Sequence, residues 1–164
     1  MIAWSVNDDL FKRELEIGYA WQCFAASFFA CNGLSVYLPP MTYRKNLSEA
    51  AEWTKHDEDM KINGRVIEVK SRRERFTHPD TFPYETAFVD TVSGYEAKDP
   101  KPIAYVFVSQ STGSMVCVSS ETASKFSISR KHDRVSGIDE DFYTCPRSML
   151  RTMDRLVAYL RPKE

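Results

Sequence analysis

Residues Asp57–Ser71 read DEDMKINGRVIEVKS, and this stretch decides the expected fold. At its centre lies Asn63-Gly64, a pair that favours a type I′ turn because that turn needs a positive φ at both central positions. We therefore expect strands over Asp59–Ile62 and Arg65–Ser71, joined as an antiparallel hairpin.

The second strand of this hairpin carries charged side chains on one of its faces. Side chains alternate along a strand, so Ile67 and Val69 point to one side. Glu68 and Lys70 point to the other side, about 7 Å apart along the strand. Val66 shares their side, so apolar residues occupy both faces and the strand is expected to be central in its sheet.

The other strand of the hairpin should bring an acidic residue to this pair. Pairing of the residues that flank the turn places Asp59 near Glu68, and Asp57, farther from the turn, is the alternative. Mg²⁺ is usually held by one or two carboxylates, and it polarises a phosphate and activates water. Lys70 can orient or deprotonate that water, or neutralise charge on the phosphate. The backbone carbonyl of Val69 can supply a further metal ligand. The simpler alternative is a solvent-facing strand with a cross-strand salt bridge.

The remaining elements follow from periodicity and turn residues. We expect a helix at Asn7–Asn32, a strand at Leu34–Leu38, one short strand near Thr86–Val92 in an otherwise mobile insert at Arg72–Pro102, a hairpin of Ile103–Ser109 and Met115–Ser119, a short helix at Ser120–Phe126, a strand at Phe142–Thr144 and a helix at Ser148–Leu160. In the first helix the core-facing stripe is Ile17, Trp21, Phe24 and Phe28. Arg130-Lys131-His132 is expected to be a solvated turn. This order predicts an α/β fold, with a mixed central β-sheet flanked by helices, as a single domain over residues 1–164.

Composition narrows the range of functions that the protein could have. The net charge of −1 excludes a strongly basic coat protein for nucleic acid, whereas a nuclease whose acidic site offsets a basic rim remains compatible. Cys23, Cys31, Cys117 and Cys145 form no C-x-x-C pair and are expected to be free thiols in a reducing compartment. Charged residues interrupt any signal-peptide pattern near the N-terminus, and the apolar run Phe24–Cys31 is too short for a bilayer. We therefore expect a cytoplasmic protein without a membrane segment.

The set Asp59, Glu68 and Lys70 resembles the active site of the PD-(D/E)XK nuclease superfamily. There an acidic residue opens one strand and E-x-K lies on the next, after a first helix with its own acidic residue. The resemblance covers about Asn7–Ser119 and implies a restriction-endonuclease-like core. It implies that Asp59 and Glu68 bind Mg²⁺, for which Mn²⁺ can substitute, and that Lys70 takes part in catalysis. The proline of the superfamily's name has no counterpart within the stretch that carries the motif.

The first helix adds to the resemblance. Residues Gly18–Gln22 and then Gly33–Val36 look like the opening of archaeal-type Holliday-junction resolvases, which carry a glycine and a glutamate four residues later. Gln22 takes the place of that glutamate here. Glu14 lies on the same helical stripe and is the candidate catalytic carboxylate in its stead, with Glu16 ranked lower.

Substrate contacts are expected from residues around the motif. Arg72, Arg73 and Arg75 follow the E-x-K strand, where a phosphate backbone would run. Gln110 ends the next strand and Gln22 lies on the first helix, and both are candidates for substrate contact. The alternative is a charged loop without a ligand.

These observations predict a Mg²⁺-dependent deoxyribonuclease, an endonuclease of the junction-resolving or phage-recycling kind that acts on DNA. A homodimer is implied by the resemblance alone. No phosphate-binding loop, nucleophile elbow or H-E-x-x-H motif is present to suggest another enzyme class. Two alternatives remain. One is a nuclease-fold module that has lost catalysis and binds nucleic acid or a protein partner, which Gln22 favours. The other is a structural protein with a chance E-x-K triplet.

Overall fold

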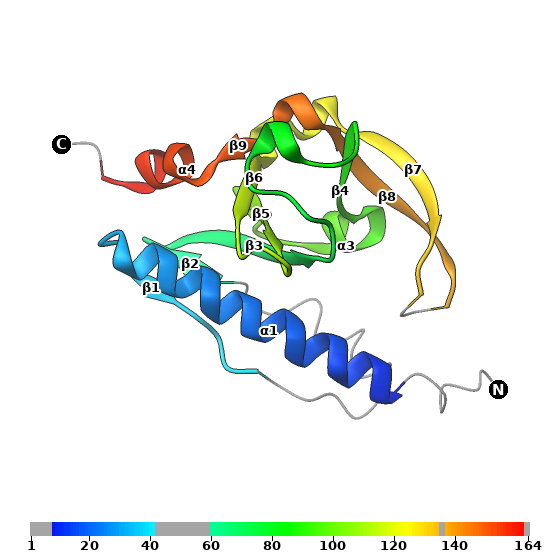
Figure 1. Ribbon diagram of the computed structural model, residues 1–164, viewed down its shortest axis with the longest axis horizontal. Coiled ribbons are helices and arrows are strands. Elements are labelled where there is room, and N and C mark those ends of the chain that lie inside the picture. The colour runs from blue at the N-terminus through cyan, green and yellow to red at the C-terminus, as the bar shows by residue number, and fades with distance from the viewer. Residues whose placement is uncertain (1–7, 42–59, 135–136, 163–164) are drawn as a thin grey trace.

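The computed structural model (Figure 1) describes residues 8–41, 60–134 and 137–162. Its helices are α1 (Asp8–Cys31), α3 (Val92–Ala97) and α4 (Met153–Leu160), with short 3₁₀ turns η1 (Pro79–Thr81), η2 (Ser120–Lys125) and η3 (Arg147–Met149). Its strands are β1 (Val36–Tyr37), β2 (Met60–Ile62), β3 (Arg65–Arg72), β4 (Thr86–Thr91), β5 (Ala104–Ser109), β6 (Met115–Ser119), β7 (Ser127–His132), β8 (Asp139–Pro146) and β9 (Arg151–Thr152).

A six-stranded mixed sheet forms the centre of the protein. Its order is β1-β2-β3-β5-β6-β9, in which β3 and β5 run parallel and all other neighbours are antiparallel. The α/β class and the mixed central sheet are therefore confirmed. β3 lies between β2 and β5 and is an interior strand, as its apolar residues on both faces predicted.

The predicted hairpin is present with its predicted register. Asn63 and Gly64 have φ values of 48° and 76°, so both occupy the left-handed region that a type I′ turn requires. Ile62 pairs with Arg65. The Asn63 side chain also accepts a hydrogen bond from the Ser35 backbone N at 2.8 Å, which ties β1 to the turn.

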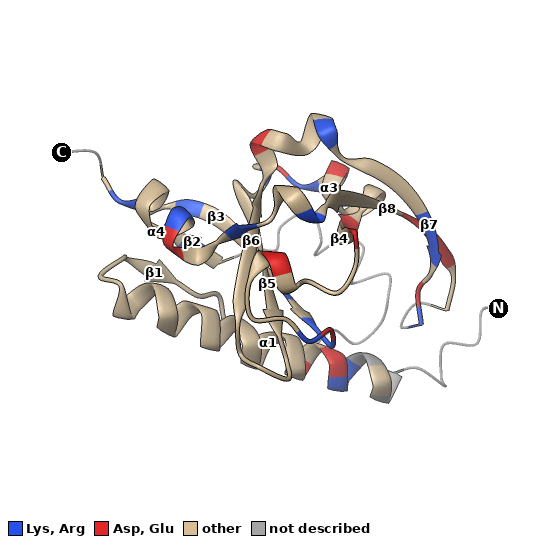
Figure 2. Ribbon diagram, turned by 45° about the horizontal axis from the view of Figure 1, so that its top comes forward, with Lys and Arg blue, Asp and Glu red and all other residues tan. Residues whose placement is uncertain are grey.

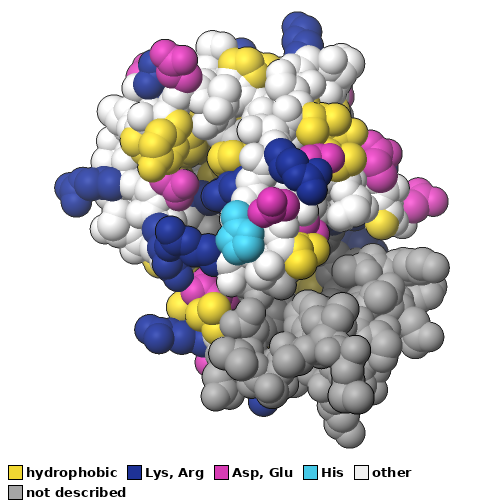
Figure 3. Space-filling model, turned by 90° about the vertical axis from the view of Figure 1, so that its right-hand side faces the viewer, with side chains coloured by type: hydrophobic (Ala, Val, Ile, Leu, Met, Phe, Trp, Pro, Cys, Tyr) yellow, Lys and Arg dark blue, Asp and Glu magenta, His cyan; other side chains and the backbone are white. Residues whose placement is uncertain are grey.

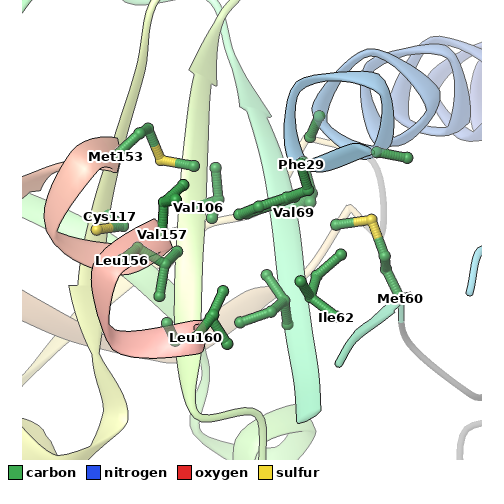
Figure 4. Packing of buried hydrophobic residues seen from close by; sticks show 14 of the residues in the cluster. Phe29, Met60, Ile62, Val69, Val106, Cys117, Met153, Leu156, Val157 and Leu160 are labelled. Atoms are coloured by element: carbon green, nitrogen blue, oxygen red, sulfur yellow. The ribbon is translucent and has the colours of Figure 1, made fainter. Parts of the chain in front are cut away.

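One face of the central sheet packs against α1 and α4. Ile67 and Val69 of β3 meet Phe29 of α1 and Leu156 of α4 in this first core (Figure 4). The predicted stripe on α1 is partly wrong, because Phe24 is 44% exposed whereas Ala25, Ala26 and Phe29 are buried. Aromatic residues lie on both the exposed side and the buried side of α1. Their spacing alone therefore does not determine which side faces the sheet.

The opposite face of the central sheet packs against a second sheet. That sheet has three antiparallel strands in the order β4-β8-β7 (Figure 1). Tyr105, Phe107 and Val116 of the central sheet meet Val89 and Cys145 of the smaller one in a second core. Helices therefore cover one face of the central sheet, while this sheet, with α3 beside it, covers the other.

The segment Arg72–Pro102 is more ordered than its composition predicted. The strand expected near Thr86–Val92 is present as β4. Phe76, Phe82 and Tyr95 are buried, and α3 follows β4 directly, so the expectation of a mobile loop around that strand is wrong. These buried aromatic residues occur at irregular spacing among polar residues, so the sequence shows no periodicity that would predict a helix or strand there.

The expected solvated turn at residues 130–132 is also wrong. Those residues belong to β7, an edge strand whose side chains are mostly exposed. Because both faces of β7 are exposed to solvent, the strand lacks the alternation of apolar and polar residues that is typical of a half-buried strand. Figure 2 shows basic and acidic residues interleaved over β7 and β8, and the pairs include Arg130–Asp141 and His132–Asp139.

The C-terminal helix begins later than predicted. Residues Ser148–Met149 lie in η3 and Arg151–Thr152 pair with β6, so α4 starts only at Met153. Backbone pairing with a sheet edge overrides the helical pattern there. Nowhere in the described parts of the chain does a helix have the length and apolar character needed to cross a membrane.

Candidate functional site

The predicted pair on β3 lies in the space between the two sheets. Glu68 is 9% exposed, on the face opposite Ile67 and Val69. The ammonium of Lys70 forms an ion pair with Glu68 Oε1. The sequence prediction that these two side chains share a face and lie together is confirmed.

A second carboxylate reaches this pair from the smaller sheet. Asp90 is 7% exposed, and its Oδ1 lies 3.3 Å from Lys70 Nζ. The Tyr105 hydroxyl donates a hydrogen bond of 2.9 Å to Asp90 Oδ2. Asp90 was not among the residues predicted from the sequence.

A β-bulge turns Asp90 inward. The register of β4 against β8 shifts between Phe88 and Asp90, which marks one extra residue on β4. Val89 and Asp90 are consecutive, yet both are buried, which regular alternation does not allow on a strand with one wet face. The bulge thus lets Val89 enter the second core while Asp90 meets Lys70.

Lys98 completes the arrangement. Its Nζ lies 2.6 Å from Asp90 Oδ2 and 2.9 Å from Glu68 Oε2. We refer to Glu68, Lys70, Asp90, Lys98 and Tyr105 together as the Glu68–Asp90 cluster. Glu68 Oε2 is fully buried and makes no hydrogen bond of good geometry, although the Lys98 ammonium is within ion-pair distance.

Local structure fixes Lys98 at the end of α3. Thr91 caps this helix by accepting a hydrogen bond of 3.0 Å from the Gly94 backbone N. A Cβ on residue 94 would lie 2.6 Å from Thr91 Oγ1 and would displace this hydroxyl from the cap. The Asp90 carboxylate accepts from the Thr91 backbone N at 2.9 Å, and the short helix then delivers Lys98 to the cluster.

The surroundings shift the pKa values of Lys70, Lys98, Asp90 and Tyr105. Burial by itself would lower the pKa of Lys70, but Glu68 and Asp90 outweigh it and raise that pKa. The pKa of Lys98 is raised in the same way, against its own burial. Burial would raise the pKa of Asp90, yet Lys70 and Lys98 lower it. Burial, and then the Asp90 charge, raise the pKa of Tyr105, so its hydroxyl stays a donor.

The arginines after the motif have different surroundings. Arg72 donates to the backbone carbonyl of Phe88, and its guanidinium lies 5.0 Å from the centroid of the Phe107 ring. Burial lowers the pKa of Arg72. Its hydrogen bond to Phe88 links β3 to β4. Arg73 is 73% exposed and pairs with Glu14 at 2.7 Å. Only Arg73 of these two therefore presents its guanidinium at the surface.

The α1 candidates lie away from the cluster. α1 packs on the face of β3 that bears Ile67 and Val69, opposite to the face of Glu68. The Glu14 carboxylate meets Arg73, just beyond the end of β3. The structure therefore does not place Glu14 or Gln22 in the Glu68–Asp90 cluster.

Gln110 links two strands of the central sheet by hydrogen bonds. It follows β5, and its backbone N donates to the Arg72 carbonyl at 2.8 Å. Its side-chain amide donates to Ser71 Oγ at 3.1 Å. Both groups are thus used to hold β5 beside β3.

The Val69 carbonyl points to the β2 edge of β3. The carbonyls of Val66 and Arg72 accept hydrogen bonds from the β5 side, at 2.9 and 2.8 Å. Because carbonyls alternate along a strand, Val69 directs its own to the opposite edge, toward β2. The described part of β2 ends at Met60, opposite Ile67. Asp59 and its alternative Asp57 lie outside the described residues.

The donors of the cluster fit a hard divalent cation. Within residues 8–41, 60–134 and 137–162, no group of three His, Cys, Asp or Glu is arranged to hold a metal. Mg²⁺ needs only one or two carboxylates, with water and substrate phosphate as its other ligands. Glu68 and Asp90 supply two, and the buried Glu68 Oε2 has an ion-pair contact with Lys98 at 2.9 Å but no hydrogen bond. These carboxylates are donors of the kind that Mg²⁺ or Mn²⁺ takes, and all four of their oxygens pair with Lys70 or Lys98 in this structure.

Comparison of the chain with protein-family models, with curated proteins and with solved structures finds no match.

Proposed function

We propose that this protein is a Mg²⁺-dependent deoxyribonuclease with a restriction-endonuclease-like core, in which Glu68 and Lys70 form the heart of the active site. One observation carries the proposal. Glu68 and Lys70 lie two residues apart on an interior strand, in direct ion contact, and face the buried carboxylate of Asp90. Removing several charges from water is costly, and groups with perturbed pKa values concentrate at functional sites.

The chain offers a set of oxygen ligands for the metal. Glu68 supplies one carboxylate, and the Val69 carbonyl points to the edge of β3 where Asp59 is predicted to act. Asp90 is the second carboxylate that the described residues provide. When bound, Mg²⁺ would polarise the scissile phosphate and lower the pKa of a bound water.

Lys70 acts in this proposal as a fixed positive charge. Its raised pKa keeps the ammonium protonated at neutral pH, so it serves poorly as a general base. It is suited to donate hydrogen bonds to a non-bridging phosphate oxygen as negative charge develops. Asp90 orients the ammonium, since its Oδ1 lies 3.3 Å from Lys70 Nζ.

DNA contact is assigned to exposed basic residues near the end of β3. Arg73 and Arg75 are exposed, whereas Arg72 is occupied by its contact with the Phe88 carbonyl. Such residues position a phosphate backbone without reading sequence. Figure 3 shows acidic and basic side chains mixed on the face that it displays, which agrees with a net charge near zero. Binding by a homodimer stays a prediction of the resemblance.

The proposal is tested by cleavage of labelled single-stranded, duplex and branched DNA with Mg²⁺, Mn²⁺ or EDTA. Metal-dependent cutting is expected from the wild type, and Glu68→Ala and Lys70→Ala should abolish it. Lys125→Ala is the matched control, because Lys125 is an exposed lysine in the last turn of η2, outside the cluster. No cutting of any DNA, together with no heat of Mn²⁺ binding in calorimetry, would overturn the proposal.

A second function is favoured by one observation. Two lysines already compensate the carboxylates of Glu68 and Asp90, so the cluster is neutral without a metal. A nuclease-fold module that has lost catalysis, and binds nucleic acid or a protein partner, would tolerate this state. DNA binding that is insensitive to EDTA, without cleavage, would support this second function.

A further inference from the structure

Lys98 occupies the position of a cation that bridges two carboxylates. Its Nζ lies 2.9 Å from Glu68 Oε2 and 2.6 Å from Asp90 Oδ2. The two carboxylates come from different sheets, and Lys98 comes from the end of α3. No other described lysine pairs with these two oxygens, since Lys70 meets Glu68 Oε1 and Asp90 Oδ1.

The fit of Lys98 to this position is incomplete on the Glu68 side. Asp90 Oδ2 accepts hydrogen bonds from both Lys98 and Tyr105, at 2.6 and 2.9 Å. Glu68 Oε2 is fully buried and has the ammonium nearby without a hydrogen bond of good geometry. An ammonium must align an N–H group to make a hydrogen bond, and Lys98 does so with Asp90 Oδ2 but not with Glu68 Oε2. Glu68 Oε2 is therefore held to Lys98 by charge alone, which makes it the weaker of the two contacts.

We infer that Glu68 and Asp90 form a divalent-cation site that Lys98 fills in the metal-free protein, so that Lys98 competes with the metal. This inference rests on the proposed function and adds to it a means of regulating metal binding. With Lys98 in place, two negative and two positive charges cancel. Exchange of this ammonium for Mg²⁺ leaves the site with one positive charge, which matches the single negative charge of a phosphodiester.

Lys98 is placed where it can leave without disturbing the sheet. It is the C-cap residue of α3, and its neighbours Ala97 and Asp99 are exposed. Its side chain is 19% exposed, so a path to solvent exists. The four-carbon stem of a lysine can turn its ammonium outward. Lys70, in contrast, is part of β3 and stays beside the site when Lys98 moves.

The direct test is Mn²⁺ binding measured by calorimetry on the full chain. Lys98→Met keeps an unbranched side chain that is one atom shorter and removes its charge. We expect this variant to bind Mn²⁺ at least about tenfold more tightly than the wild type, because a competing unit charge within 3 Å of both carboxylates is gone. Lys125→Met removes an exposed lysine of η2, outside the cluster, and should leave Mn²⁺ affinity unchanged. Adding Asp90→Asn to Lys98→Met should abolish the gain.

Thermal unfolding gives a second readout that does not depend on cleavage. Mn²⁺ should raise the Tm of Lys98→Met by more than it raises that of the wild type. If Lys98→Met does not fold without metal, its refolding should be restored by Mn²⁺. A variant that binds Mn²⁺ no more tightly than the wild type, or that Mn²⁺ does not stabilise or refold, would overturn the inference.

The failure of this inference differs from failure of the proposed function. Metal-dependent cleavage by the wild type, lost in Glu68→Ala, with no gain in Mn²⁺ affinity for Lys98→Met, would overturn the role of Lys98 alone. Tighter Mn²⁺ binding by Lys98→Met without cleavage of any DNA would establish the cation site and overturn the nuclease.

Discussion

Lys70 and Asp90 join the two sheets of this protein. Lys70 lies on β3 of the central sheet and Asp90 on β4 of the smaller one, yet Lys70 Nζ and Asp90 Oδ1 are 3.3 Å apart. Asp90 is buried, and its carboxylate also contacts Lys98 and Tyr105. It therefore couples the stability of the packing between the sheets to the chemistry of the site.

Replacement of Asp90 should destabilise the protein strongly. Asp90→Asn leaves Lys70 and Lys98 with one carboxylate between them, and loss of one partner from a buried pair typically costs about 3–5 kcal/mol. Urea unfolding at pH 7 measures the loss. Asp141→Asn is the control, because its pair with Arg130 is exposed and should contribute less than about 1 kcal/mol. Equal losses in the two variants would contradict the structural role of Asp90.

The contribution of Asp90 should vanish in acid. The pKa of Asp90 is lowered in the folded protein by Lys70 and Lys98, which outweigh its burial. Its stabilising contribution is therefore fully present above the unfolded-state pKa of about 3.9, and it is lost as the pH falls through the folded-state pKa. The difference in unfolding free energy between wild type and Asp90→Asn should stay constant from about pH 6 to 8 and shrink below about pH 4. A difference that grows in acid would reverse this sign.

Two glycine-to-alanine substitutions should act in opposite directions. Gly94→Ala would place a Cβ 2.6 Å from Thr91 Oγ1, disturb the cap of α3 and cost about 1–2 kcal/mol. Gly18→Ala lies within α1, with no atom within 4 Å of the new Cβ, and should stabilise by up to about 1 kcal/mol. Thermal melts of both variants decide this. A neutral Gly94→Ala would show that α3 does not need its close approach to Thr91.

The cysteines should separate into two classes by reactivity. Cys31 is exposed and Cys23 half-buried, whereas Cys117 and Cys145 are buried. Burial raises the pKa of Cys117 to about 12 and that of Cys145 to about 11, so neither forms the reactive thiolate near neutral pH. Titration with a chromogenic disulfide at pH 8 should modify Cys31 first. Cys117 and Cys145 should react only after unfolding in guanidinium, and fast labelling of either in the folded protein would contradict their burial.

Neighbouring arginines should differ in what they contribute. Arg73→Ala removes an exposed ion pair and should change stability by less than about 1 kcal/mol. It should also weaken DNA binding and reduce the salt dependence of that binding by about one ion. Arg72→Met removes the donor to the Phe88 carbonyl and should lower the unfolding free energy instead. Fluorescence anisotropy across a salt series, beside urea melts, separates the two effects. An unchanged salt slope in Arg73→Ala would remove Arg73 from the proposed DNA contact.

Local pattern determined the hairpin and the motif that it carries. Asn63-Gly64 specifies a turn whose backbone few other residues adopt, so the register of β2 against β3 follows from two residues. Once that register exists, the two-residue period of a strand places Glu68 and Lys70 on one face. Each step depends on residues close in sequence, which is why the sequence alone predicts it.

The tertiary structure decided which groups complete the site. Asp90 enters through a bulge on β4, and Lys98 enters from the end of α3, 30 positions after Glu68. A bulge adds one residue to a strand without changing its composition, so alternation alone could not assign Asp90 to the interior. An acidic residue at the end of the predicted strand, followed by the capping residue Thr91, was the one local signal available. The packing of one sheet on the other then placed both carboxylates within reach of the same two lysines, and this contact between distant segments has no sequence period from which to predict it.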